Sequence, residues 1–213
     1  QEQLISLGVT SQSECDAIEK KYRSTIENGD SVAHNLATQP NESMWFDWTP
    51  YINQKGDAEM ESTFNHDRFK ELAQIAFTPP KNFVLQKQVE KIFADRIQMA
   101  EKKIPVNWGF AENMAYATLL DQGYPIRFTG QDIRRGTFSH RHAVVLNQKD
   151  GEGSMPLVKI AESANTTIDI YDSLLSEEAV LGFEYGYSAT RPSGLVIWEA
   201  QFGDFVNGAQ VVI

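Results

Sequence analysis

The chain has 213 residues, of which 41% are hydrophobic and 23% are charged, and its formal net charge is −10. This composition suits one α/β core with a smaller accessory segment and excludes a disordered or fibrous chain. An acidic protein is repelled by a phosphate backbone and by an anionic membrane, so neither is expected as the main partner. Its single cysteine, Cys15, excludes an internal disulfide, and no apolar run reaches the roughly 18 residues of a membrane span. We therefore expect a soluble protein of a reducing compartment.

The first half of the chain reads as a helical and irregular region. Apolar residues at spacings of three and four, with glycine or proline at the boundaries, predict helices at residues 12–28, 67–76 and 83–100. Between them, residues 31–65 look irregular, and their aromatic cluster MWFDWTPY, residues 44–51, is expected to pack on a neighbouring surface. We assign residues 1–103 to this helical linker region. Because no Met precedes Gln1, and the chain stops in the apolar run GAQVVI, we expect an excised fragment.

After residue 104 short apolar strands alternate with helices. The pattern predicts strands at residues 124–129, 143–147, 167–172 and 195–198, and helices at residues 107–123 and 176–190. Such alternation is typical of a parallel sheet covered on both faces, so residues 104–213 are expected to form a three-layer α/β domain. Polar clusters follow three of the strands. Because the carboxyl ends of parallel strands share one edge, the sequence predicts a ligand site at that edge.

Small residues form a stripe on the helix predicted at residues 176–190. Ala179, Gly182, Gly186 and Ala189 fall on one face. Each internal glycine costs about 1 kcal/mol relative to alanine, so a compensating close approach of another helix or of a partner subunit is expected there.

Two glutamates begin the same helix. Glu177 and Glu178 are favourable at the positive end of a helix macrodipole, which is the simpler interpretation. The functional interpretation places a carboxylate at the end of a strand in an apolar pocket, where desolvation raises its pKa and lets it share a proton with a ligand nitrogen. Only the position after TIDIYDSLL favours this second interpretation.

Two histidines alternate in the motif HRH. On an extended backbone His140 and His142 would point to the same side. They could begin a metal site, but no cysteine or third nearby histidine completes it. They also suit a site for a carbonyl or carboxylate substrate, and a purely structural role is equally open.

The neighbourhood of these histidines offers further binding groups. Arginines gather around HRH at positions 127, 134, 135 and 141, which suggests an anionic ligand, although pairing with Asp132 or other acids gives the same pattern. Phe202 and Phe205 follow the last strand, where they could stack on a flat heterocycle or pack in the core.

Three motifs carry a family resemblance. GQDIRRGTFSHRHAVVLNQ, SLLSEEAVLGFEYGYS and WEAQFGDFVNGAQVVI resemble the thiamine diphosphate-dependent first component of the 2-oxoglutarate dehydrogenase complex, in its transketolase-like pyrimidine-binding domain. The resemblance extends from about residue 104 to the end, which implies a domain truncated at its C-terminus. The preceding segment, including FDWTPY, resembles that family's region between the diphosphate-binding and pyrimidine-binding domains.

The resemblance implies roles for individual residues. Glu177 would hydrogen-bond N1′ of the aminopyrimidine and so favour its imino tautomer. Phe202 and Phe205 would pack on the pyrimidine ring. Gln131 and Asp132 would lie beside the cofactor. The substrate would meet His140, Arg141 and His142, with the two histidines taking part in catalysis.

The implied reaction is the oxidative decarboxylation of 2-oxoglutarate in the tricarboxylic acid cycle. The succinyl group would pass to a lipoyl arm on dihydrolipoamide succinyltransferase. The parent enzyme would be a homodimer in the bacterial cytoplasm. Because the motif that holds Mg²⁺ and the diphosphate is missing, the chain alone should not turn over.

Two rival hypotheses belong to other classes. A metal-dependent hydrolase would use HRH together with Asp132 and Glu177 as ligands for zinc or manganese. A noncatalytic interaction module would dock on another protein through the aromatic cluster and the helical region. Neither accounts for all three motifs.

Overall fold

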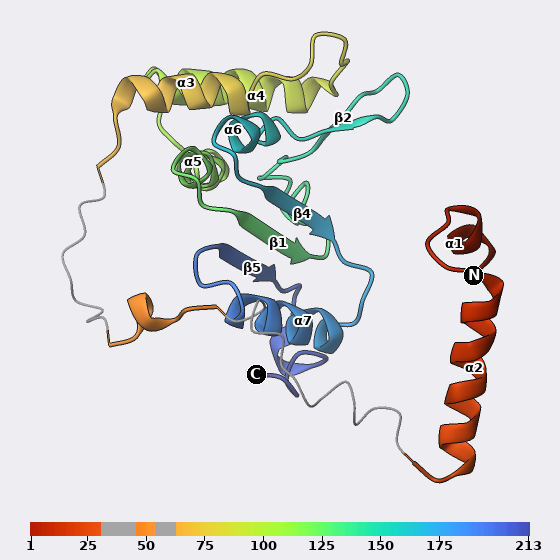
Figure 1. Ribbon diagram of the computed structural model, residues 1–213. Coiled ribbons are helices and arrows are strands. Elements are labelled where there is room, and N and C mark those ends of the chain that lie inside the picture. The colour runs from red at the N-terminus through yellow and green to blue at the C-terminus, as the bar shows by residue number, and fades with distance from the viewer. Residues whose placement is uncertain (31–45, 54–62) are drawn as a thin grey trace. The chain divides into compact units, whose positions relative to one another are not determined.

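The computed structural model describes residues 1–30, 46–53 and 63–213 (Figure 1). Contacts between residues divide the chain into two compact units, residues 1–45 and 46–213. No helix in the described ranges is long and apolar enough to cross a membrane.

The described part of the first unit consists of two helices, α1 (Glu2–Ser6) and α2 (Gln12–Glu27). Ser11 caps α2 in a capping box with Glu14, which satisfies two backbone N–H groups at its start. The helix predicted at residues 12–28 is therefore confirmed. None of its residues is buried.

The second unit is built on a three-stranded sheet. Its strands are β1 (Ile126–Gly130), β4 (Ile168–Asp172) and β5 (Leu195–Glu199), in the order β4-β1-β5 and all parallel. The predicted parallel sheet is thus confirmed. The stretch predicted at residues 143–147 forms only the short strand β2 (Val145–Leu146), which pairs antiparallel with β3 (Gly153–Ser154) outside this sheet.

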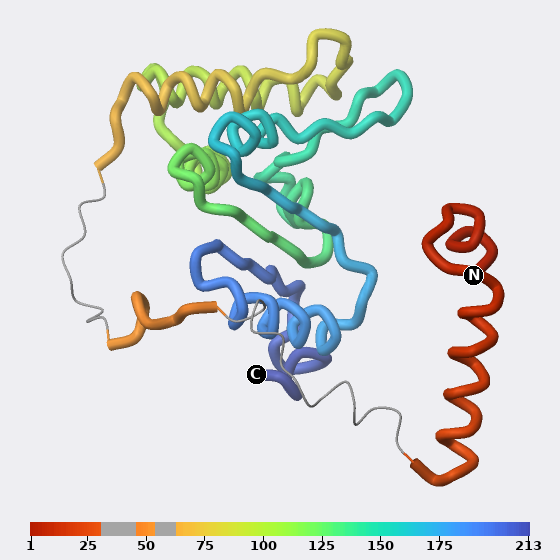
Figure 2. The backbone as a smooth tube through the Cα atoms, viewed as in Figure 1, coloured from red at the N-terminus to blue at the C-terminus, as the bar shows by residue number. Residues whose placement is uncertain are grey.

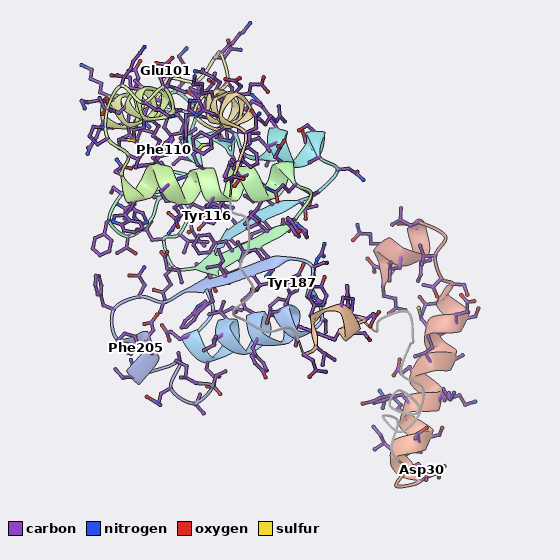
Figure 3. All side chains as sticks on the ribbon, turned by 90° about the vertical axis from the view of Figure 1, so that its left-hand side faces the viewer. Asp30, Glu101, Phe110, Tyr116, Tyr187 and Phe205 are labelled. Atoms are coloured by element: carbon purple, nitrogen blue, oxygen red, sulfur yellow. The ribbon has the colours of Figure 1, made fainter. Side chains whose placement is uncertain are left out.

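Helices cover both faces of the sheet, as the sequence predicts. On one face lie α5 (Trp108–Asp121) and α6 (Val158–Ser163), and on the other lies α7 (Glu177–Ala189) (Figures 1 and 2). Figure 3 shows Tyr116 between α5 and the sheet, where its ring meets the Phe128 ring edge-on at 6.0 Å. Asn107, the first residue of the helix predicted at residues 107–123, caps α5 by accepting a hydrogen bond from the Phe110 amide at 2.9 Å.

The helices upstream of residue 104 share the core of the α/β part. α3 (His66–Ala76) and α4 (Lys87–Ala100) form an outer layer over α5 and α6 (Figure 1). Leu72 and Ala73 of α3 are fully buried, and the Phe77 ring lies 5.8 Å from Phe93 and 5.7 Å from Phe110. The compact unit therefore begins at residue 46, while the domain boundary near residue 104 stays a prediction.

Two details of the helices differ from the sequence prediction. α4 begins at Lys87 rather than near residue 83, because the Gln86 side chain caps it by accepting from the Gln88 and Val89 amides. α6 was not predicted, since it is short and no side chain caps its start.

Within the described part of the aromatic cluster, Trp48 contacts α7. Trp48 donates its indole N–H to the Ala189 carbonyl at 2.9 Å and meets the Tyr51 ring edge-on. This contact satisfies a carbonyl at the end of the helix. Met44 and Trp45, which the sequence places in the same cluster, lie outside the described residues.

Candidate functional site

The polar clusters that follow the three strands all begin at one edge of the sheet. In the strand register Gly130 stands opposite both Asp172 and Glu199. Gly130 has φ 154°, and a Cβ there would lie 2.5 Å from the Glu199 carbonyl oxygen, so a side chain would force β1 and β5 apart. The shared edge predicted from the sequence is therefore present.

Glu177 lies at this edge, at the first position of α7. Ser176 caps the helix, and the Glu177 side chain is half-buried beside the positive end of the helix dipole. Gln131 donates its Nε2 hydrogen to Glu177 Oε1 at 3.1 Å. Gly208 passes so close to the carboxylate that a Cβ at this position would overlap Oε2. The neighbouring Glu178 is exposed, so the two glutamates have different surroundings.

A glutamine pair connects Glu177 to a cavity. Gln201 Nε2 donates to the Gln131 carbonyl at 2.8 Å and to Thr137 Oγ1 at 2.6 Å. Gln201 also lines a cavity of about 440 Å³ whose walls are residues 137, 138, 140, 199–203 and 205. The Glu177 carboxylate is thus linked to the cavity wall through Gln131, whose side chain donates to Glu177 and whose carbonyl accepts from Gln201.

Aromatic rings form the rim of this cavity. Phe202 and Phe205, both predicted to bind the cofactor, line it together with Phe138. Phe138 and Phe202 meet edge-on at 5.9 Å and are 74% and 80% exposed. Large apolar rings exposed around a hollow are typical of a binding surface for a flat ligand. Sequence reasoning missed Phe138, although it lies two residues before HRH.

The two histidines of HRH have different environments. His140 lines the cavity, and its Nε2 lies 3.5 Å from Glu112 Oε2. His142 has φ 45°, so the backbone is not extended there, and its half-buried ring is not part of the cavity wall. Burial lowers the pKa of His142, and the positive charge of Arg96 lowers it further. The turn at His142 therefore separates side chains that an extended backbone would place together.

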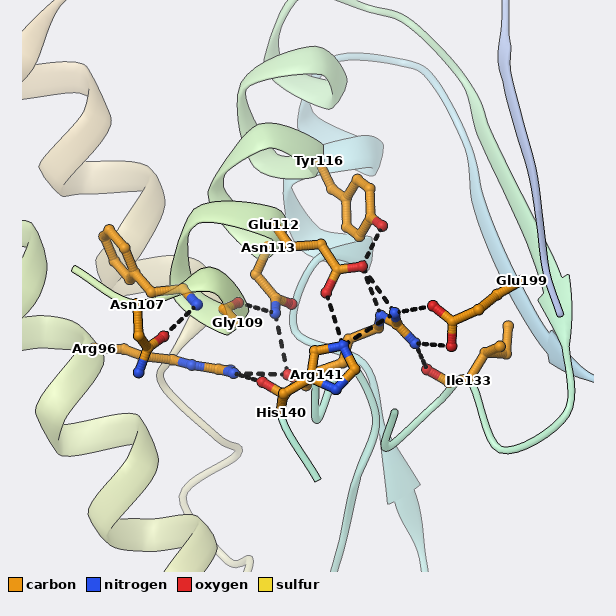
Figure 4. Close-up of polar contacts among 11 residues, drawn as sticks. Arg96, Asn107, Gly109, Glu112, Asn113, Tyr116, Ile133, His140, Arg141 and Glu199 are labelled. Atoms are coloured by element: carbon orange, nitrogen blue, oxygen red, sulfur yellow. Dashed lines mark hydrogen bonds and ion pairs between the residues drawn. The ribbon is translucent and has the colours of Figure 1, made fainter. Parts of the chain in front are cut away.

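Arg141 is buried and does not line the cavity, and its guanidinium lies between Glu112 and Glu199 (Figure 4). Its guanidinium donates to Glu112 Oε1 at 2.9 Å, to the Ile133 carbonyl at 2.8 Å and to the Glu199 carboxylate. Glu112, on α5, was not singled out from the sequence. The predicted substrate-binding role of Arg141 stays a prediction, and in this structure the side chain ties α5, the HRH segment and β5 together.

The other arginines of the positive cluster are also paired. Asp132, predicted to bind the cofactor, forms an ion pair with Arg135. Arg127 donates to Glu184 Oε2 at 2.8 Å, beneath the aromatic rings of α7. Of the two interpretations that the sequence left open, pairing with acids accounts for these contacts.

The structure does not bring together the ligand set of the rival hypothesis, a metal-dependent hydrolase. Among the described residues, the histidine and carboxylate atoms that converge belong to Glu112, His140 and Glu199. Arg141 forms ion pairs with both of these carboxylates, and its positive charge opposes a cation at the same place.

Comparison with known proteins identifies the family. Residues 104–213 match the family described as transketolase, pyrimidine binding domain. The chain belongs to this family, which confirms the predicted class of fold.

Three individual relatives show which proteins with this domain the chain resembles. The chain is 49% identical over 210 residues to the "2-oxoglutarate dehydrogenase E1 component" of Azotobacter vinelandii, covering 99% of this chain and 22% of that protein. It is 45% identical over 212 residues to the protein of the same name from Haemophilus influenzae, covering 100% of this chain and 22% of that protein. The Coxiella burnetii protein of that name is 44% identical over 192 residues, covering 90% of this chain and 20% of that protein. The predicted resemblance is confirmed, and the chain spans about a fifth of the length of these relatives.

Proposed function

We propose that this chain is part of a thiamine diphosphate-dependent 2-oxoglutarate dehydrogenase and supplies the half-site that activates the aminopyrimidine. The observation that carries the proposal is the environment of Glu177. One carboxylate oxygen is held by Gln131, and the other accepts no hydrogen bond from any residue that the structure describes. A half-buried carboxylate with a free acceptor atom suits a partner that can share a proton with it. The names of the relatives support the same substrate.

The residues of the site fit an aminopyrimidine. Phe138 and Phe202 present exposed aromatic surface, and Phe205 completes the same rim. A flat heterocycle gains apolar contact from such rings, while Glu177 at the adjacent helix start offers an acceptor to its ring nitrogen. Gln131 would orient the carboxylate through its existing hydrogen bond. The residues present therefore match the chemistry of the ring.

The cofactor, when bound, supplies the electron sink that allows a 2-oxo acid to lose carbon dioxide. The chain's own contribution is position and proton control. Glu177 would hold a proton at the pyrimidine nitrogen, and His140 would face the substrate from the cavity wall. His140 lines the cavity, whereas Arg141 and His142 do not, so we place the contributions of these two neighbours in the shape and charge of that wall. Asp132, paired with Arg135, would act beside Gln131 at the edge of the site.

The proposed whole enzyme has partners that this chain alone does not include. A further domain would hold Mg²⁺ and the diphosphate, and a dihydrolipoamide succinyltransferase would accept the succinyl group on its lipoyl arm. We place the enzyme in the bacterial cytoplasm. The chain by itself would be inactive.

Helix α7 supports a homodimer. A Cβ at Gly182 or Gly186 would meet nothing within 4 Å, although an internal glycine costs about 1 kcal/mol relative to alanine. Phe183 and Tyr185, on the same helix, are exposed. Close approach of a second subunit would compensate the glycines and cover these rings.

The test is the substitution Glu177→Gln in the full-length enzyme, with Glu178→Gln as the matched control. Glutamine keeps the size of the side chain, but its amide cannot take up or release a proton as a carboxyl group does. We expect decarboxylation of 2-oxoglutarate to fall by about 10²–10⁴-fold, the usual contribution of a positioned acid or base. The control should retain activity, since Glu178 is exposed. Wild-type turnover by a folded Glu177→Gln enzyme would refute the proposal.

A further inference from the structure

A buried arginine outside the matched family region reaches the candidate site. Arg96 belongs to α4, is 1% exposed, and stacks its guanidinium on the rings of Phe77 and Phe93, 5.0 and 5.7 Å from their centroids. Its Nη2 donates to the His140 carbonyl at 2.6 Å and to the Arg141 carbonyl at 2.9 Å (Figure 4). Burial lowers the pKa of Arg96 to about 10, so the group stays charged at neutral pH.

Arg96 forms no ion pair with any described residue, and its Nε and Nη1 atoms are buried without a hydrogen-bond partner among them, so both of its hydrogen bonds to described residues come from Nη2. Burying a charge without a partner is unfavourable unless its hydrogen bonds are strong and well placed. Both bonds of Nη2 go to consecutive carbonyls of the HRH segment. A charged donor makes hydrogen bonds roughly twice as strong as a neutral donor does. The placement of the charge therefore favours one conformation of this backbone.

The backbone that Arg96 contacts has a rare conformation. His142 has φ 45°, in the left-handed region that few residues with a Cβ adopt. The peptide unit before it is held at both ends. Its oxygen, on Arg141, accepts from Arg96 and, at 3.1 Å, from Asn113 Nδ2, while the His142 amide donates to the Arg135 carbonyl at 2.9 Å.

Helix α5 approaches the same backbone segment closely. A Cβ at Gly109 would overlap the His140 carbonyl oxygen, so the helix backbone and Arg96 meet at one carbonyl. His140 itself lines the cavity. Displacement of its carbonyl would therefore displace a ring of the cavity wall.

We propose that Arg96 is a positioning residue of the candidate site, which fixes the turn of the HRH segment and so holds the His140 ring at the cavity. The proposal rests on the proposed function for the role of His140, but its structural part does not. It assigns a task to the helical segment before residue 104: α4 helps to build the site.

The first experiment measures hydrogen–deuterium exchange in the full-length protein and needs no turnover. Arg96→Met keeps an apolar stem on the two rings and removes both hydrogen bonds. The matched control is Arg68→Met on α3. It removes the ion pair with Asp121 and changes the net charge by the same amount as Arg96→Met. The informative amides are those of residues 141–143, which donate to carbonyls of residues 134 and 135. We expect them to exchange at least about tenfold faster in Arg96→Met and unchanged in the control.

The second experiment measures 2-oxoglutarate decarboxylation by the same variants. Because misplacing a reacting group by about 1 Å can cost about 10²-fold, we expect kcat to fall by about 10- to 100-fold in Arg96→Met. Arg96→Lys keeps the charge and can reach one carbonyl, so it should restore part of kcat and part of the protection, and it replaces Arg96→Met if that variant does not fold. Unchanged exchange at residues 141–143, or unchanged kcat beside faster exchange, would overturn the proposal. An inactive wild type would refute the proposed function, and the exchange result would still decide whether Arg96 fixes the turn.

Discussion

Gly208 provides a way to move the Glu177 carboxylate without removing it. Its backbone φ is not in the left-handed region, so alanine is compatible with the local conformation. A Cβ there would overlap Glu177 Oε2 and lie 3.2 Å from Cδ and 3.3 Å from Cβ of the same side chain. The three atoms nearest to the added methyl group of Gly208→Ala therefore all belong to the proposed catalytic group.

The size of the effect follows from these contacts. Non-bonded carbon atoms settle at about 3.5–4.0 Å, so the carboxylate must shift by about 1 Å to admit the methyl group. An off-rotamer side chain costs about 0.5–1.5 kcal/mol, and loss of the Gln131 hydrogen bond costs about 1 kcal/mol. The free energy of unfolding should thus fall by only about 1.5–2.5 kcal/mol. A displacement of this size at a reacting group can cost about 10²-fold in rate.

The assay compares kcat for 2-oxoglutarate decarboxylation and the midpoint of chemical denaturation in the full-length enzyme. Gly153→Ala is the matched control, since a Cβ there makes ordinary contacts of 3.6 and 3.7 Å with Val144 and Leu146. We expect a large loss of kcat with a small loss of stability in Gly208→Ala, and neither in the control. Wild-type kcat in Gly208→Ala would show that the reaction does not depend on the position of Glu177.

Two further predictions concern buried charges near the site. Arg141→Met leaves Glu112 and Glu199 without their partner, so the free energy of unfolding of this chain, measured in urea, should fall by about 3–5 kcal/mol; a change below about 1 kcal/mol would contradict the proposed support beneath the cavity. Burial lowers the pKa of His142, so below its ordinary pKa of about 6.5 the unfolded chain binds a proton that the folded chain does not, and stability falls as the pH drops. His142→Gln should therefore lose less stability than the wild type between pH 7 and pH 5, and an identical loss would contradict this assignment.

The sequence predicts those features that local chemistry determines. Asn107 caps α5 because its side chain accepts from an amide at a known offset, and α7 forms within the range predicted for it. The alternation after residue 104 predicts the parallel sheet, and with it the shared edge that carries Glu177 and Phe202. None of these inferences requires a contact between distant segments.

The sequence does not predict how buried charges pair. Glu112 lies on an apolar helix and Arg96 on an amphipathic one, where charged residues are ordinarily solvated. Their partners stand 29 and 44 residues further along the chain, at a distance that no periodicity encodes. The left-handed turn at His142 is hidden for the same reason, since the groups that hold the preceding carbonyl, Arg96 and Asn113, are distant in the sequence.

These buried charges explain how an exposed aromatic rim can keep its shape. Phe138 and Phe202 are largely exposed, so burial of their rings contributes little to holding the segments that carry them. Both segments are instead held from beneath, where Arg141 joins Glu112 to Glu199 at the start of the Phe202 segment. Binding costs less free energy when the cavity walls do not have to be ordered by the ligand. Apolar residues in place of these charges could give an equally stable protein, so the expected benefit of the charges is a preformed cavity. The charges are therefore better understood as organising the cavity than as stabilising the fold.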